Sequence, residues 1–429
     1  MLKKLRYKID ASLKDIEKLF STESLANAEI SNSVSEIIND VKTNGNKALF
    51  NYTKKFDNFE INENNLRISS DEIEKSAKNV DKEFLKSAEI AYSRIKNYHE
   101  RQLPIDEKFK DNEGNQLGWK WNAVDSVAIY VPGGKALYPS SVLMNAVPAL
   151  VAGVKRIVML NPTPNGILNP SLLACAKICG ISEIYRIGGA QAISAVTYGT
   201  ETIEKVVKIV GPGNSYVAEA KKQVFGSVGI DSIAGPSEIL VIADASANAK
   251  YIAADLLSQA EHDELARAIL VTNSNEFAEK ISKEIEVMIE KISRTEIASQ
   301  SIKNNGYIIL VEDIEDAAEI ANIIAPEHLE IITADPEKLS RKIHNAGAIF
   351  LGEYTPEAIG DYIAGPSHVL PTMATAKFSS GLGVLDFMKR TSMIKCTKES
   401  FDTIAPHAMN FAKQEKLDAH GLSVKLRIN

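Results

Sequence analysis

The stretch SVAIYVPGGKALYPSSVLMNAVPALVAGVKRIVML (residues 126–160) decides the fold class. It begins with the apolar run 126–131, passes through a Gly- and Pro-rich turn, continues in a helical pattern from about Ser140, and ends in the apolar run 156–160. A short apolar run, a turn, a helix and a second apolar run predict a β-α-β unit with buried parallel strands.

The same alternation continues in both directions from this stretch. A second series of strands and helices begins at Ser237, so the chain is predicted to be α/β, with two consecutive Rossmann-like parallel-sheet units. The further strands are expected at EIYRI (183–187), KVVKIV (205–210), EILVIAD (238–244), RAILVTN (267–273), YIILV (307–311), LEIITAD (329–335) and AGAIFLG (346–352), with helices at 170–179, 190–198, after Gly213, and at 247–262, 275–292 and 313–323.

Four regions are predicted from these changes of pattern. The N-terminal region looks helical and polar, with a break at Asn44-Gly45, and its first 23 residues could form an arm. The tail 397–425 looks helical but has little apolar mass of its own, so we expect it to pack elsewhere, such as on another subunit. The predicted limits are 1–124 for a mostly helical region partly joined to the second unit, 125–236 and 237–381 for the two α/β units, and 382–429 for the tail.

Composition excludes several classes of protein. With 429 residues, 45% hydrophobic and 24% charged, the chain is expected to build more than one core. A formal net charge of -7 argues against a nucleic-acid partner. The longest apolar stretch, 142–154, is too short for a membrane span, and the three cysteines indicate a reducing compartment, so a cytoplasmic protein is expected. Cys175 and Cys179 are interpreted as small buried residues of a helix.

Several histidines stand beside carboxylates or amides. In AADLLSQAEHDE (253–264), Gln259 and His262 are three residues apart on a predicted helix, so they share a face and could bind zinc. In IIAPEHLEI (323–331), Glu327 and His328 follow Pro326 at a helix-to-strand junction. Neighbours in sequence generally point in different directions, so each could accept a proton in a different step. Taken alone, a helical histidine such as His262 is more often an ordinary side chain with its hydrogen bonds satisfied. Glu327 and His328 are equally well explained by a polar turn before a strand.

Two later motifs add candidates. GDYIAGPSHVLPT (360–372) places Asp361 and His368 in a loop, and Asp361 could be an oxygen ligand for a metal ion. QEKLDAHGLS (414–423) carries Glu415 and His420 in the tail, where a histidine is usually a surface residue.

Gly-rich turns form the last group of motifs. VPGGKALYPS (131–140), RIGGAQAI (186–193) and IVGPGNSYVAEAK (209–221) each join a strand to a helix, where backbone N–H groups can bind phosphate or sugar oxygens. None of them matches G-x-G-x-x-G, so the standard dinucleotide fingerprint is missing.

Taken together and in this order, the motifs resemble those of the histidinol dehydrogenase family. The blocks that carry the resemblance span residues 130–421: YVPGGKALYPSSVLMNAVPA (130–149), GGAQAI (188–193), GPGNSYVAEAK (211–221), DSIAGPSEILVIAD (231–244), DLLSQAEHD (255–263), APEHLEI (325–331), GDYIAGPSHVLPT (360–372) and LDAHG (417–421).

The resemblance implies an NAD-dependent enzyme with one zinc ion per subunit and units of the aldehyde-dehydrogenase-like type. It implies that L-histidinol is oxidised to L-histidine through L-histidinaldehyde with two NAD, and that zinc mainly positions the substrate. The resemblance implies that Glu327 and His328 accept protons and that zinc is bound by Gln259, His262, Asp361 and His420. It implies that the substrate contacts these four zinc ligands together with Ser237, His328 and Glu415. NAD is implied to contact Tyr130, Gln191 and Asn214 on the first α/β unit, and His368 is given a supporting role.

The resemblance also implies a homodimer in which the C-terminal tail crosses to the partner. No cysteine lies in a matching block, which disfavours a covalent thiohemiacetal. Three other functions remain open. They are a zinc hydrolase, which would not use NAD, a non-catalytic relative that only binds a ligand, and a dehydrogenase of another amino alcohol.

Overall fold

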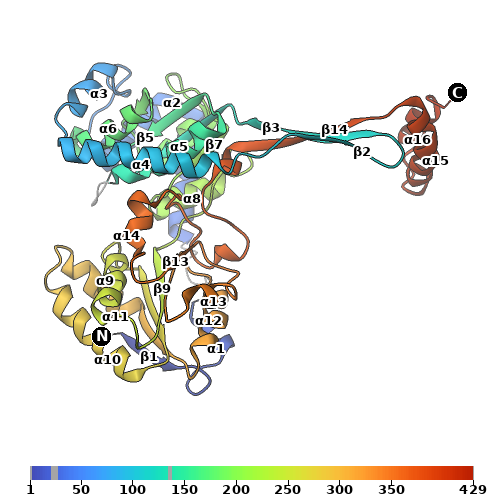
Figure 1. Ribbon diagram of the computed structural model, residues 1–429. Coiled ribbons are helices and arrows are strands. Elements are labelled where there is room, and N and C mark those ends of the chain that lie inside the picture. The colour runs from blue at the N-terminus through green and yellow to red at the C-terminus, as the bar shows by residue number, and fades with distance from the viewer. Residues whose placement is uncertain (1, 21–27, 134–137, 429) are drawn as a thin grey trace.

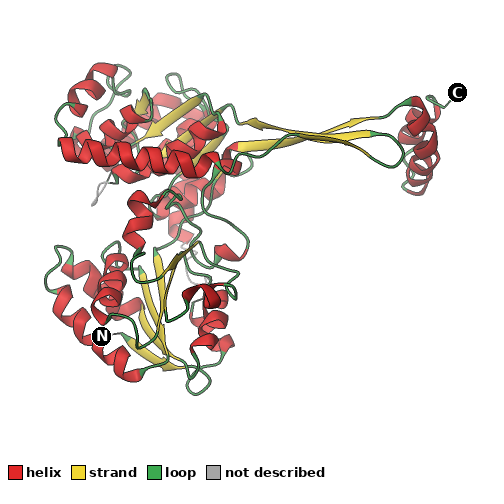
Figure 2. Ribbon diagram, in the orientation of Figure 1, coloured by secondary structure: helices red, strands yellow, loops and turns green. Residues whose placement is uncertain are grey.

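Two α/β units and a long projecting arm make up the molecule (Figure 1). The computed structural model describes all residues except 1, 21–27, 134–137 and 429. Both units contain a sheet of parallel strands covered by helices (Figure 2). The predicted α/β class, with two parallel-sheet units, a helical N-terminal region and a helical tail, is therefore confirmed.

The first unit contains five parallel strands in the order β6-β5-β4-β7-β8. Alternate residues of β4 enter opposite cores: Val127 and Ile129 pack against α4, α5 and α6, while Ala128 and Tyr130 pack against α2, α7 and α8. Because both faces of the sheet are covered, its strands are continuous apolar runs. The elements of this unit are β4 (Ser126–Tyr130), α5 (Pro139–Ala152), β5 (Arg156–Leu160), α6 (Pro170–Ile178), β6 (Glu183–Tyr185), α7 (Gly189–Tyr198), β7 (Lys208–Val210), α8 (Ser215–Val224) and β8 (Gly229–Ile230).

The second unit contains six parallel strands in the order β1-β11-β10-β9-β12-β13. Its sheet is also covered on both faces, by α9, α10 and α11 on one side and by α1 and α12 on the other. The elements are β9 (Glu238–Ala243), α9 (Ala249–Ala260), β10 (Arg267–Thr272), α10 (Asn275–Ile289), α11 (Thr295–Asn305), β11 (Gly306–Leu310), α12 (Ala317–Ile324), β12 (His328–Ile332), α13 (Pro336–Ser340), β13 (Ala348–Leu351) and α14 (Glu357–Ile359), which leads into the π-helical turn η3 (Gly360–Ala364).

The N-terminal region serves both units. β1 (Lys3–Arg6) adds a parallel edge strand to β11, although we expected a helical region there, because its Lys- and Arg-rich sequence lacks the apolar run of a buried strand. The following helices are α1 (Leu13–Leu19), α2 (Ala28–Asp57), α3 (Ser70–Ala77) and α4 (Lys82–Glu100), of which α2 to α4 pack on the first unit. α2 is broken at Gly45, as predicted.

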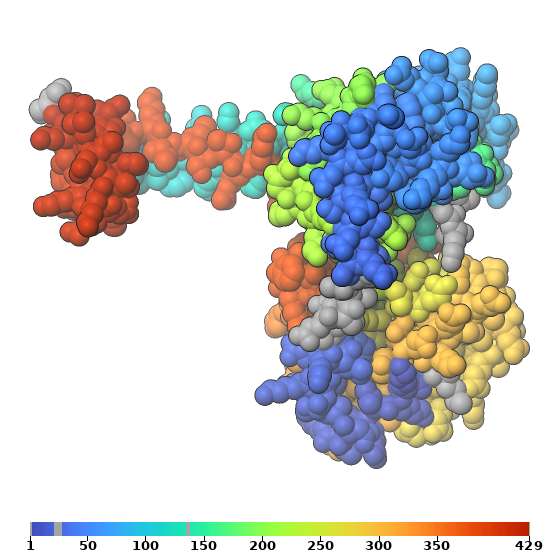
Figure 3. Space-filling view, turned by 180° about the vertical axis from the view of Figure 1, so that it is seen from behind, coloured from blue at the N-terminus to red at the C-terminus, as the bar shows by residue number. Residues whose placement is uncertain are grey.

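The arm is an antiparallel three-stranded ribbon that the sequence did not predict. It pairs β3 (Gln116–Ala123) with β14 (Met388–Lys395) and with β2 (Glu107–Lys110), and it ends in α15 (Lys398–Gln414) and α16 (Asp418–Lys425). Both views show it extending away from the two units (Figures 1 and 3). The predicted helical tail is confirmed, but it is carried at the end of this ribbon. Among the described residues, no helix is long and apolar enough to cross a membrane.

Candidate active site

The first group of site residues lies at the amino-terminal edge of the second sheet, where β9 and β12 begin. Glu327 directly precedes β12, and its Oε2 accepts a hydrogen bond from the backbone N–H of Glu238 at 3.0 Å. His328 is the first residue of β12, and both side chains are buried. Ser237 is partly buried and directly precedes β9.

Glu327 and His328 point toward each other, which corrects our expectation that these neighbours diverge. Glu327 Oε2 and His328 Nδ1 are 3.7 Å apart. We expected sequence neighbours to point in different directions, but Glu327 lies just before the strand, where the chain leaves left-handed Ala325 (φ 48°) and Pro326. The two groups can therefore act on one ligand.

Two polar groups lie within hydrogen-bond distance of one ring nitrogen of His328. Its Nδ1 lies 3.1 Å from the carbonyl oxygen of Glu238 and 3.1 Å from Nε2 of Gln259. A proton on Nδ1 can be donated to this carbonyl, which leaves Nε2 to accept a proton from a ligand. Nε2 faces Asp361 Oδ1 at 3.6 Å.

The second group of site residues offers ligand atoms for a metal ion. One ligand atom each of His262, Glu357 and Asp361 lies within 4.8 Å of the others. Gln259 is fully buried at the end of α9, and its Oε1 has no hydrogen-bond partner among the described residues. Nitrogen and oxygen donors of this kind suit zinc, and an unpartnered buried amide oxygen is otherwise costly, so the residues present fit a metal ion.

His262 lies just beyond the helix on which we expected it. α9 ends at Ala260, and the N–H of His262 donates to the carbonyl of Gln259 at 3.1 Å in the turn that follows. Asp361 lies in η3 and not in an irregular loop. His368 does lie in a loop, where its Nδ1 is 3.0 Å from the carbonyl oxygen of Asp361 and its Nε2 is 3.3 Å from Ser141 Oγ. It therefore connects the Asp361 segment to α5.

Burial and mutual repulsion shift the acid–base properties of these residues. Burial raises the pKa of Glu327 to about 7 and that of Glu357 to about 8. Burial lowers the pKa of His328, but the carboxylates of Glu357, Glu327 and Asp361 outweigh it and raise this pKa well above its usual value. Burial lowers the pKa of His262 and of His368. Shifted acids and bases gathered at one site are typical of catalytic centres.

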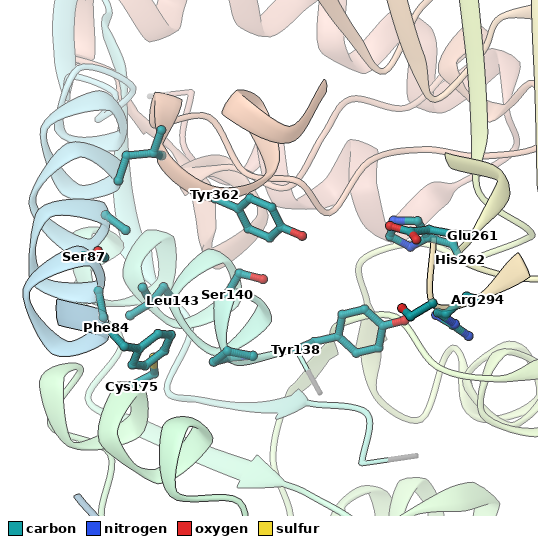
Figure 4. Close-up of a pocket in the computed structure, with 15 residues that line it drawn as sticks. Phe84, Ser87, Tyr138, Ser140, Leu143, Cys175, Glu261, His262, Arg294 and Tyr362 are labelled. Atoms are coloured by element: carbon teal, nitrogen blue, oxygen red, sulfur yellow. The ribbon is translucent and has the colours of Figure 1, made fainter. Parts of the chain in front are cut away.

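A cavity of about 560 Å³ lies between His262 of this cluster and the first unit (Figure 4). His262, Glu261 and Arg294 line it on the side of the second unit, and Tyr138 and Ser140, at the start of α5, line it on the side of the first. Its apolar end is formed by Phe84, Leu143 and Cys175, among others. Cys175 and Cys179 are buried as predicted, and burial raises the pKa of the Cys175 thiol to about 12, so it does not act as a thiolate.

The residues expected to contact NAD come together at the carboxyl edge of the first sheet. Tyr130 ends β4, and its hydroxyl accepts a hydrogen bond from the N–H of Gly189 at 3.1 Å. Gln191 lies in the first turn of α7, and its buried Oε1 has no hydrogen-bond partner within the described part of the chain. Asn214 is exposed and caps the start of α8. Strand order reverses between β4 and β7, and ligands of parallel sheets bind beside such a reversal.

Two of the predicted site residues are not at this site. Glu415 follows α15 and His420 lies in α16, and both are exposed. These helices lie at the end of the arm, away from α9 and α14 of the same chain (Figure 1). Of the predicted Gly-rich turn 131–140, residues 134–137 lie outside the described residues.

Sequence reasoning missed three acidic residues near His328. Glu357 lies four residues before Asp361, the spacing of one helical turn, which was a usable signal. Glu330 is buried in β12 and accepts the N–H of Glu357 at 2.8 Å. The carbonyl of Glu238 contacts His328, and nothing in the sequence marks a backbone atom as part of a site.

The fold and the site together define the class of protein. It is a two-unit α/β enzyme with a buried acid–base centre next to side chains suited to bind a metal ion. The histidinol dehydrogenase family model matches residues 21–428. Histidinol dehydrogenase of Bradyrhizobium diazoefficiens is 52% identical over 426 residues, which cover 98% of this chain and 99% of that protein. The corresponding enzyme of Rhodospirillum rubrum is 58% identical over 341 residues, 79% of each chain.

A solved structure agrees with these relatives. The crystal structure of histidinol dehydrogenase from Elizabethkingia anophelis has a TM-score of 0.94 and 37% sequence identity, and the match covers 100% of this chain and 98% of that one. The chain belongs to the histidinol dehydrogenase family and is an oxidoreductase.

Proposed function

We propose that the chain oxidises L-histidinol to L-histidine through L-histidinaldehyde, with two NAD and one zinc ion per subunit, as the last steps of histidine biosynthesis. The observation that carries the proposal is the convergence of Glu327 and His328 beside the His262–Glu357–Asp361 cluster, whose His262 lines a cavity that reaches the first unit. Family membership supports the same substrate.

Residues of this chain would hold both zinc and NAD. Zinc would be bound by Gln259, His262, Asp361 and His420 from a second copy of the chain, and NAD by Tyr130, Gln191 and Asn214. When bound, zinc holds the imidazole and amine of the substrate in place, and NAD accepts the hydride. Ser237, His328 and Glu415 are the further contacts proposed for the substrate.

The proton transfers are assigned to two residues of this chain. His328 takes the proton of the alcohol at Nε2, because the carbonyl of Glu238 accepts from Nδ1. The carboxylates of Glu357, Glu327 and Asp361 stabilise the imidazolium that forms. Glu327 then takes a proton from the water that adds to the aldehyde, while the His328 imidazolium returns its proton to the carbonyl oxygen, which gives the hydrate and leaves His328 neutral. His328 then takes a proton from the hydrate as the second hydride leaves.

A homodimer with exchanged tails and a cytoplasmic location are parts of the same proposal. The side chains of Ile394, Phe411 and Leu426 on the arm are each at least 71% exposed in the single chain. Apolar side chains exposed in this way favour burial against a second copy.

The test is NADH formation from L-histidinol, followed by absorbance, with metal-loaded protein and after treatment with a chelator. Two NADH per histidinol, lost with the chelator, is the expected result. Glu327→Gln should lower kcat by roughly 100-fold or more, because general acid–base catalysis contributes at least this factor. Glu337→Gln, an exposed glutamate of α13, is the matched control and should not change kcat.

Other outcomes would favour the alternatives. No NADH from zinc-loaded protein would contradict the dehydrogenase and leave a zinc hydrolase or a binding protein. Faster oxidation of an amino alcohol without an imidazole would contradict the substrate.

A further inference from the structure

Asp57 is an acidic residue at the carboxyl edge of the first sheet that the proposed mechanism does not use. It is the last residue of α2. The next residue, Asn58, donates from Nδ2 to Oδ1 of Asn165 at 2.8 Å, and Asn165 lies in the turn that follows β5. Asp57 also interacts electrostatically with Tyr130 at the end of β4. It therefore stands beside the strand ends where we propose that NAD binds.

The environment of Asp57 is unfavourable for a carboxylate. Its Oδ2 is buried and has no hydrogen-bond partner among the described residues. The two lysines of the last turn are engaged elsewhere: Lys54 pairs with Glu60 at 3.3 Å, and Lys55 lies over the ring of Phe56. The C-terminus of a helix is also its negative end. Burial raises the pKa of Asp57 to about 6, with no contribution from a neighbouring cation.

The groups near Asp57 need hydrogen-bond donors. Oε1 of Gln191 is a second buried acceptor, again without a hydrogen-bond partner in the part of the chain that the structure describes, and Gly188 and Gly189 bring the start of α7 close to Tyr130. Two acceptors of this kind fit the hydroxyl groups of a sugar. They do not fit a phosphate, which is negatively charged and only accepts hydrogen bonds at its ionised oxygens.

We propose that Asp57 accepts hydrogen bonds from the adenosine ribose of the dinucleotide and makes the site select NAD against its 2′-phosphorylated form. In dinucleotide folds an acidic side chain at the carboxyl edge plays this part, but it usually follows the second strand. Here the acidic residue lies at the end of a helix that precedes the sheet, so no G-x-G-x-x-G motif marks its position in the sequence. The proposal rests on the proposed use of NAD.

The test is titration of the full-length, zinc-loaded protein with NADH and with NADPH, followed by the fluorescence of the bound nucleotide. Wild type should bind NADH more tightly. Asp57→Asn should weaken NADH binding roughly tenfold, since hydrogen bonds to a charged group are worth about that factor. It should also reduce the preference for NADH over NADPH by roughly tenfold, because a like-charge repulsion is removed.

Controls separate this role from a structural one. Asp71→Asn, which removes an exposed carboxylate from α3, should leave both dissociation constants unchanged. The melting temperature of Asp57→Asn without nucleotide should be equal to or above that of wild type, because a buried carboxylate without a partner is removed.

Two results would overturn the inference. Equal weakening of NADH and NADPH, or no weakening beyond that of Asp71→Asn, would exclude selection by Asp57 while leaving the use of NAD intact. Wild-type protein that binds neither nucleotide would overturn the proposed function as well.

Discussion

At the scale of single residues, a buried ion pair holds one glycine of the first unit. Gly211 follows β7 in the left-handed region (φ +105°), and a Cβ there would lie 2.3 Å from the carbonyl oxygen of Tyr130. Its N–H donates to Oδ2 of Asp231 at 2.7 Å, and its carbonyl accepts from Nζ of Lys221 at 3.0 Å. Lys221 and Asp231 also pair with each other, and both are almost fully buried. The turn that leads to Asn214 therefore depends on this pair.

Removing one partner of the pair should destabilise the protein strongly. We expect Lys221→Met to lower the free energy of unfolding by about 3–5 kcal/mol, because Asp231 is left charged and buried. Lys222→Met, at the exposed neighbour, should change it by less than about 1 kcal/mol. Denaturant unfolding measures both. A loss for Lys221→Met no larger than that for Lys222→Met would show that Asp231 finds another partner.

Asp57 should make stability depend on pH. Its pKa is raised from 3.8 to about 6 by burial, so the folded state binds the proton more tightly than the unfolded state. The resulting stabilisation is complete below about pH 4 and is lost as the pH rises through about 6. The melting temperature of Asp57→Asn minus that of wild type should therefore increase as the pH is raised from 4 to 7. A difference that does not change across this range would contradict the raised pKa.

At the scale of elements, α4 holds the π-helical turn that carries Asp361. Nε of Arg94 donates to the carbonyl of Ile363 at 2.5 Å. Gly365 follows the turn with φ +125°, and a Cβ there would lie 3.1 Å from Cβ of Tyr98. An N-terminal helix thus fixes a segment of the second unit that lies about 270 residues later in the chain.

Loosening this contact should weaken the proposed zinc site. Arg94→Met keeps the apolar stem but loses the donors, and we expect roughly a tenfold loss of zinc affinity, as for other residues that orient metal ligands. Competition with a chelating dye measures it. Lys96→Met, on an exposed position of the same helix, is the control. Equal zinc affinity in the two variants would show that η3 keeps Asp361 in place without Arg94.

At the scale of the whole molecule, the arm separates Glu415 and His420 from the rest of the proposed site. The ribbon β14-β3-β2 is exposed on most of its surface and has no core of its own. Arg390 lies over the rings of Trp119 and Trp121, which joins two of its strands. We propose that a second copy of the chain covers the exposed apolar side chains of the arm and receives His420.

Mixed dimers test this exchange. A Gln259→Ala chain and a His420→Ala chain should each be inactive alone, and together they should recover up to about a quarter of wild-type activity, because half of random dimers are mixed and each has one intact site. Two Gln259→Ala chains carrying different tags are the control for mixing. No recovery in the mixed sample would mean that His420 serves its own chain or none.

The sequence by itself determined the two parallel-sheet units and most of their elements. In runs such as 126–131 and 238–243, side chains on both faces of the strand are mostly apolar because helices cover both faces of the sheet. This burial can therefore be recognised from the sequence. Local motifs likewise indicated Glu327, His328, Gln259, His262 and Asp361, since residues a few positions apart meet through local geometry.

Only the tertiary structure decided the rest, because it depends on contacts between distant segments. β3 and β14 pair across about 270 residues. β14 is exposed along most of its length, and the alternation of half-buried Leu117, Trp119 and Trp121 in β3 does not indicate which segment it pairs with. β1 joins an edge for the same reason. The carbonyl of Glu238 at Nδ1 of His328 and the position of Asp57 at the carboxyl edge of the first sheet follow from how strands and helices meet in space, and no local sequence pattern encodes those meetings.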